Sequence, residues 1–210
     1  MTMTIEVEID SHSQAIILTL QKNLVNFCKL LPSHVDKWRN LLNESKKPVQ
    51  ALVNYSEQLR HVEKANISYI ENFKVLQDKL MYKIFSEIED EITLIKGIID
   101  QLHTANQEVK NKLSILEKST IDLDWDLETP IIRGTAFQPP LSRILQEGYN
   151  YILFFTSALK SVNDHIKILN IRNEQFMKNF ENKFKIDLES KVVINYLAIV
   201  QYIGNEKAAV

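Results

Sequence analysis

One stretch of the chain, from Met81 to Leu116, constrains the fold more than any other. Its apolar residues follow one another in alternating steps of four and three, with a single polar residue in the series. The positions are Met81, Phe85, Ile88, Ile92, Ile95, Ile99, Leu102, Asn106, Val109, Leu113 and Leu116. An apolar seam sustained over about five heptads is typical of a long α-helix that packs along its length.

Further apolar residues widen this seam on one side. Ile84, Ile98 and Ala105 lie beside it, which is more than a two-stranded coiled coil requires. The pattern therefore favours a bundle in which other helices fold onto this one. Asn106 is expected to set the register if it faces a polar group of a neighbouring helix.

A second long seam with the same steps follows the Pro139–Pro140 pair, and its phase can be traced as far as Phe180. Its members are Leu141, Leu145, Gly148, Ile152, Phe155, Leu159, Val162, Ile166 and Leu169. This predicts a second long helix packed on the first. The seam residues expected to form the helix contacts are Ile92, Ile99, Leu102, Asn106, Ile152, Phe155 and Leu159.

The remaining segments are shorter or interrupted. Apolar stripes also run through the first 62 residues, but Pro32 and Pro48 divide them, which predicts a kinked or segmented helical arm antiparallel to the long helix. The apolar spacing in residues 190–203 predicts a short amphipathic helix or, alternatively, a β-rich tail. Residues 1–10 alternate apolar and polar residues and could form a short edge strand or an irregular start.

The predicted fold is therefore all-α, an elongated and coiled-coil-like helical bundle with two long heptad helices and a segmented N-terminal arm. Residues 1–118 would hold the arm and the central helix, residues 119–140 a linker, and residues 141–210 the second long helix and the short C-terminal helix. The first and last of these parts are expected to form one structural unit. The apolar seams could be buried against helices of the same chain or against helices of another chain.

Reactive sites are harder to find. The five histidines show no spacing typical of zinc sites, and the chain has one cysteine, Cys28, which is expected to be a buried apolar residue. No phosphate-binding glycine loop or nucleophile elbow occurs. We therefore expect no catalytic residue, metal or cofactor. The net charge of −2 and the short apolar runs argue against direct nucleic acid binding and membrane insertion.

The linker carries the one segment with features of a binding site. Apolar residues alternate there with carboxylates, in the order Ile121, Asp122, Leu123, Asp124, Trp125, Asp126 and Leu127. An exposed strand with this pattern could pair with the sheet edge of a partner. Alternatively, the segment folds back on the bundle and leaves its carboxylates in solvent. A calcium loop is excluded, because Leu127 and Arg133 replace the glycine and the glutamate that such a loop needs.

The order of several short segments resembles a family of helical ribosome-maturation factors, the AFG-two-interacting ribosome maturation factor family. The resemblance covers about residues 14–170 and lies in Cys28-Lys-Leu-Leu-Pro32, Trp38-Arg-Asn-Leu-Leu42, Pro48-Val, 52–59, 73–80 and 139–146. The chain departs from the family at Tyr149–Phe155, where an apolar run replaces an expected basic tract. Direct contact with ribosomal RNA is therefore not expected.

The resemblance implies a non-catalytic subunit of an AAA ATPase complex. Its partners would be a hexameric AAA ATPase, a second helical adaptor similar to the cyclin-dependent-kinase-interacting protein, and a precursor of the large ribosomal subunit. The complex would release and recycle a maturation factor in the cytoplasm and nucleus. The alternative from the seams alone is a coiled-coil subunit of a tethering, kinetochore or cytoskeletal complex.

Overall fold

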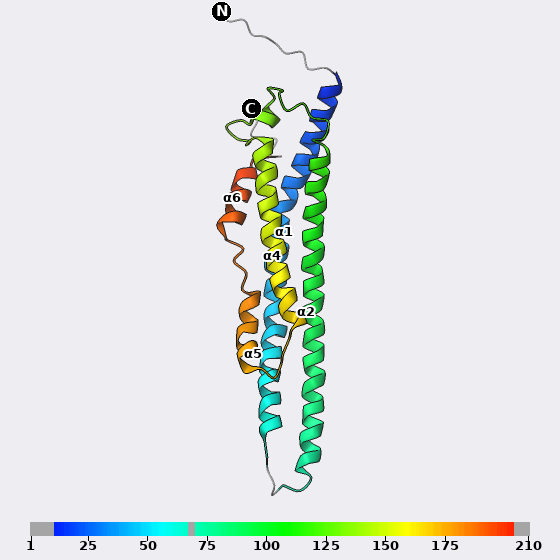
Figure 1. Ribbon diagram of the computed structural model, residues 1–210, viewed down its shortest axis with the longest axis vertical. Coiled ribbons are helices and arrows are strands. Elements are labelled where there is room, and N and C mark those ends of the chain that lie inside the picture. The colour runs from blue at the N-terminus through cyan, green and yellow to red at the C-terminus, as the bar shows by residue number, and fades with distance from the viewer. Residues whose placement is uncertain (1–10, 67–69, 204–210) are drawn as a thin grey trace, which may run out of the picture. The chain divides into compact units, whose positions relative to one another are not determined.

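The computed structural model describes residues 11–66 and 70–203, and all regular structure in these ranges is helical (Figure 1). The α-helices are α1 (Ser11–Lys64), α2 (Phe73–Lys118), α3 (Pro130–Arg133), α4 (Leu141–Lys167), α5 (Glu174–Phe180) and α6 (Lys191–Val200), with a 3-10 helix η1 (Glu181–Phe184) after α5. The predicted all-α helical bundle is confirmed. The alternating stretch at residues 1–10 lies outside the described residues.

The chain divides into two compact units, each assembled from separate segments of the sequence. Unit 1 contains the described residues of 1–35, 106–154 and 189–210, and unit 2 contains residues 36–105 and 155–188. Helices α1, α2 and α4 each contribute one segment to each unit. The units therefore do not follow the order of the chain, because each is held together by contacts between segments distant in sequence.

The core of unit 1 is built around aromatic side chains. The ring centroid of Tyr196 in α6 lies 5.5 Å from that of Tyr151 in α4 and 6.5 Å from that of Phe27 in α1. Gly148 in α4 makes room for this cluster, because a Cβ atom there would lie 3.0 Å from Tyr196 Oη and 3.3 Å from Leu113 Cδ1. The absence of a side chain at Gly148 therefore lets Tyr196 and Leu113 pack closely against α4.

Unit 2 contains an antiparallel pair of helices formed by the segments of α1 and α2. The hydroxyl of Tyr55 lies 3.4 Å from the Glu87 carboxylate, and the Gln77 amide donates to the carbonyl of Val62, 2.6 Å away. Val62 lies in the last turn of α1, where carbonyls lack partners within the helix, and its carbonyl also accepts from the Ala65 amide (3.3 Å). In the same unit, Trp38 packs on Phe155 with ring centroids 4.9 Å apart.

Helix α1 runs through both prolines that were expected to divide it. A proline inside a helix removes one hydrogen bond and costs about 3 kcal/mol. Beside Pro32, however, Leu31 and Val35 are almost fully buried, and burial of each such side chain contributes about 1.5–3 kcal/mol. Packing therefore offsets the local cost, and the prediction of separate helical segments is wrong.

Helix α4 also differs from its prediction, because it ends at Lys167 and the apolar phase resumes only in a separate helix. The side chain of Asn173 accepts a hydrogen bond from the Phe176 amide (2.9 Å) and caps α5. An N-cap of this kind fixes the start of a new helix.

Residues 191–200 form helix α6, so the predicted short helix is confirmed there and the β-rich alternative is wrong.

Candidate functional site

The linker between α2 and α4 belongs to unit 1 and is a series of turns with one short helix. Thr129 precedes α3, Pro130 is its first residue, and the amide of Gly134 donates to the Pro130 carbonyl (2.9 Å). Gly134 has φ +86°, a conformation that L side chains rarely adopt. Residues 121–127 form no strand, so the exposed-strand alternative for this segment is wrong.

Only one of the four apolar residues in this segment is buried. Leu123 is 7% exposed, whereas Ile121 and Trp125 are 75% and 41% exposed. Leu127 is half-buried. The segment is therefore anchored through Leu123, while Ile121 and Trp125 remain accessible to another molecule.

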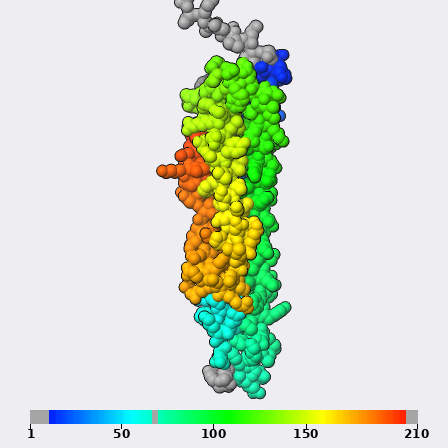
Figure 2. Space-filling model, in the orientation of Figure 1, coloured from blue at the N-terminus to red at the C-terminus, as the bar shows by residue number. Residues whose placement is uncertain are grey.

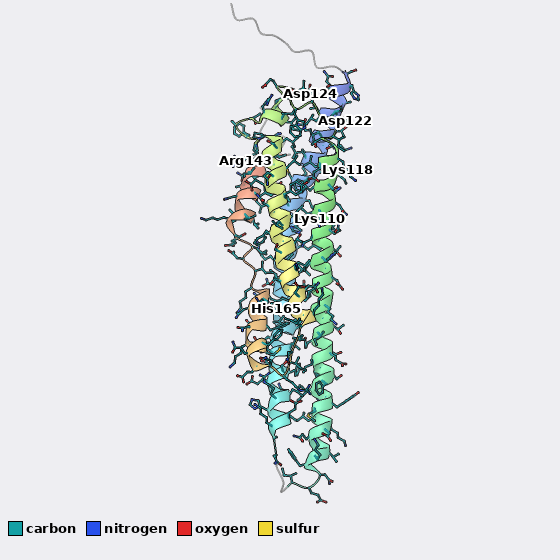
Figure 3. The ribbon with its side chains drawn as sticks, viewed as in Figure 1. Lys110, Lys118, Asp122, Asp124, Arg143 and His165 are labelled. Atoms are coloured by element: carbon teal, nitrogen blue, oxygen red, sulfur yellow. The ribbon has the colours of Figure 1, made fainter. Side chains whose placement is uncertain are left out.

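The carboxylates of the segment face solvent. Asp122, Asp124 and Asp126 are all exposed, and the Asp124 carboxylate accepts from the Asp126 amide (2.9 Å). The one cation within the linker, Arg133, forms an ion pair with Glu128 (3.0 Å). Figure 3 shows Asp122 and Asp124 beyond the end of α2. The accessible apolar side chains thus stand among carboxylates, an arrangement suited to a partner with apolar residues and a basic rim.

Two further exposed aromatic residues were not singled out from the sequence. Phe137 in the linker is 61% exposed and Tyr202 after α6 is 49% exposed. Their rings meet edge to face with centroids 6.2 Å apart. A pair of exposed aromatic residues from two segments cannot be found from periodicity, because neither belongs to a seam.

A buried polar cluster lies in unit 1 where Asn106 interrupts the apolar seam. Asn106 Oδ1 lies 3.1 Å from His34 Nε2, and Nδ1 of the same ring lies 2.8 Å from the Tyr151 hydroxyl. An amide oxygen only accepts, so Nε2 donates to Asn106 Oδ1, and Nδ1 forms the second hydrogen bond of the ring with the Tyr151 hydroxyl. Asn106 thus faces a polar group of a neighbouring helix, the condition stated for a register-setting residue. His34 and Tyr151 were not predicted to take part.

The seam residues chosen from the sequence differ in burial. Four are buried, namely Ile99, Leu102, Phe155 and Leu159. Three are half-buried, namely Ile92, Asn106 and Ile152. In the unit 1 segment of α4, Ile144 and Tyr151 are buried in place of Leu145 and Ile152, each one position before the predicted residue. The predicted seam positions Leu141 and Gly148 are buried as expected, so the core is shifted by one residue only at Leu145 and Ile152.

Burial favours the neutral form of one thiol and two phenol groups in the core. Burial raises the pKa of the Cys28 thiol to about 12, and it raises the pKa values of Tyr151 and Tyr196 above the usual range for tyrosine. A thiol that stays protonated is a poor nucleophile. In the described ranges, no cluster of three or more His, Cys, Asp or Glu side chains could hold a metal ion, and no helix has the length and apolar character to span a membrane.

Comparison with known proteins identifies a family. No curated protein matches the chain. Residues 18–190, however, match the family described as CA109-like, ribosome biogenesis protein C1orf109-like. The match includes both long seams and the linker with Trp125. The chain therefore belongs to the ribosome biogenesis protein C1orf109-like family.

Proposed function

We propose that the protein is a non-catalytic adaptor subunit of an AAA ATPase complex that acts in maturation of the large ribosomal subunit. Membership of a ribosome biogenesis family gives it a role in ribosome biogenesis. The proposed task within it is to hold an ATPase on its substrate particle, so that a maturation factor is released and recycled. The sequence resemblance to AAA-ATPase-associated maturation factors supports this task.

The observation that carries the proposal is the exposure of Ile121 and Trp125 among the carboxylates of the linker. Tryptophan is enriched among the residues that contribute most to protein–protein binding. Carboxylates around such a side chain favour a partner with a basic rim and increase the association rate. We assign this surface to the contact with the hexameric ATPase.

The other components follow from the same proposal. A second helical adaptor similar to the cyclin-dependent-kinase-interacting protein would join the complex, and the precursor of the large ribosomal subunit would be its substrate. The protein would need neither membrane nor direct nucleic acid contact and would work in the cytoplasm and the nucleus. It would have no catalytic activity of its own, so any turnover by the purified protein without partners would contradict the proposal.

The proposal is tested by purifying the tagged full-length protein from cells and identifying its partners by mass spectrometry. An AAA ATPase and pre-ribosomal factors are expected with the wild type and absent with Trp125→Ala. Tyr82→Ala is the matched control, because Tyr82 is an exposed aromatic residue in unit 2 (79% exposed). Recovery of coiled-coil structural proteins without an ATPase would overturn the proposal in favour of a tethering, kinetochore or cytoskeletal subunit.

A further inference from the structure

The unit 1 segment of α4 carries two apolar stripes, and only one of them is used by the core. Ile144 and Tyr151 are fully buried. Tyr149 and Leu153, four residues apart and therefore on one face, are 52% and 64% exposed. Ile152 lies between the two stripes and is half-buried. The second stripe is an apolar helix face that the described part of unit 1 leaves uncovered.

This second stripe borders a groove between α4 and α2 in unit 1. The groove has a volume of about 350 Å³, and Leu113 lies at its buried base. Tyr149 and Ile152 form its apolar wall on α4. The wall on α2 is polar and is formed by Gln107, Lys110, Asn111, Ser114 and Glu117. Figure 2 shows these α2 and α4 segments adjoining on the visible face, and Figure 3 labels Lys110 on α2.

Two opposite charges stand on the polar wall. Lys110 and Glu117 are seven residues apart on α2, which places them about 10.5 Å apart along the helix axis. Neither side chain forms an ion pair with any residue in the described part of the chain. The groove therefore has an apolar wall on α4 and a polar wall on α2. On the polar wall, the cation Lys110 and the anion Glu117 lie two helical turns apart and form no ion pair with a described residue.

We propose that this groove binds an amphipathic α-helix of a partner protein. The apolar face of that helix would cover Tyr149, Ile152 and Leu153 by the packing of one helix in the groove between two others. Its edge toward α2 would carry an acidic and a basic side chain two turns apart, which pair with Lys110 and Glu117. This goes beyond the proposed function, because it defines a second surface and does not depend on an ATPase at the linker.

A second copy of this chain covers the groove less well than a separate helix. A two-fold contact could pair Lys110 with Glu117 of another copy, but it would bring the polar walls of α2 together. Tyr149 and Leu153 of both copies would then remain in solvent. A single amphipathic helix covers the apolar wall and pairs with both charges at once.

The proposal is tested by replacing Tyr149 with the photocrosslinker p-benzoylphenylalanine in the full-length protein expressed in cells. The expected crosslinked peptide comes from another protein, has apolar residues spaced by three and four, and carries opposite charges seven residues apart. The same replacement at exposed Tyr82 in unit 2 is the control and should not capture that peptide. A peptide from a second copy, a peptide without the helical pattern, equal capture at Tyr82 or no capture would overturn the proposal.

A charge exchange tests the polar wall independently. The double variant Lys110→Glu/Glu117→Lys keeps the net charge but opposes both partner charges, so capture at position 149 should fall by at least about tenfold. Reversing the two charges of the partner helix should restore it, whereas undiminished capture by the double variant would contradict the proposal. Trp125→Ala should leave capture unchanged, which separates a failure here from a failure of the proposed ATPase contact.

Discussion

Nδ1 of His34 lies 2.8 Å from the hydroxyl of Tyr151, although 117 residues separate them in the chain. Both side chains are buried, with His34 4% exposed and Tyr151 fully enclosed. The Tyr151 hydroxyl also lies 3.4 Å from the Leu31 carbonyl, a longer contact to α1. This polar cluster thus links α1, α2 and α4 within unit 1.

The variant Tyr151→Phe is expected to destabilise the protein by about 1–3 kcal/mol, because it removes a hydrogen bond from a buried imidazole. Urea unfolding followed by circular dichroism would measure this change. Tyr149→Phe is the matched control, since its hydroxyl is on an exposed residue two positions away, and it should change stability by less than about 0.5 kcal/mol. Equal effects of the two variants would show that the cluster contributes nothing.

Two glycines within helices should respond differently to alanine. A Cβ atom at Gly97 meets nothing within 4 Å, so Gly97→Ala should stabilise the protein by about 1 kcal/mol through helix propensity. At Gly148 the Cβ atom would lie 3.0 Å from Tyr196 Oη, whose hydroxyl donates to the Ile144 carbonyl (3.1 Å). Gly148→Ala should therefore not show the stabilisation expected for Gly97→Ala. Gly148→Leu should lower the free energy of unfolding by at least about 3 kcal/mol. Thermal melts of the three variants would measure these changes in stability.

A charge placed on a buried seam position should be far more damaging than one on an exposed position. Ile99→Asp and Leu159→Asp in unit 2 should each cost about 3–5 kcal/mol, because an unpaired carboxylate would be buried. Leu94→Asp is the control on α2, since Leu94 is 57% exposed. Melting temperatures that are alike for all three variants would show that Ile99 and Leu159 do not support a core.

Stability should fall in alkaline solution because of Cys28. Burial raises its pKa from 9.0 to about 12 in the folded protein. Below pH 9 the thiol is protonated in both states, whereas between pH 9 and 12 the unfolded chain releases the proton and the folded chain does not. Stability should therefore decline above pH 9 by up to about 1.4 kcal/mol per pH unit.

This decline is best measured by urea unfolding between pH 8 and 10, below the range in which the buried tyrosines add to it. Cys28→Ala should weaken the decline while lowering stability at pH 8 through the lost packing. A thiol reagent should react slowly with the folded wild type and rapidly after unfolding. Fast reaction with the folded protein would contradict the buried, protonated state.

Much of the helical architecture was predictable from the spacing of apolar residues. The seam from Met81 to Leu116 correctly indicated one helix that ends near Lys118, because a regular spacing of four and three is a property of a single helix. The short helix at residues 191–200 followed from the same reasoning. In the linker, the sequence shows that carboxylates alternate with apolar residues. It does not show that Ile121 and Trp125 are exposed, because their exposure depends on how the turns fold.

Other features were decided by tertiary structure. Periodicity describes one helix at a time, so on α4 it could not tell which of two adjacent apolar residues faces the core, and it chose Ile152 where Tyr151 is buried. It could not weigh the local cost of Pro32 against the burial of Leu31 and Val35. Nor could it bring together His34, Asn106 and Tyr151. The sequence alone determined where helices form, whereas burial against neighbouring segments determined their continuity, their orientation and the pairing of their polar groups.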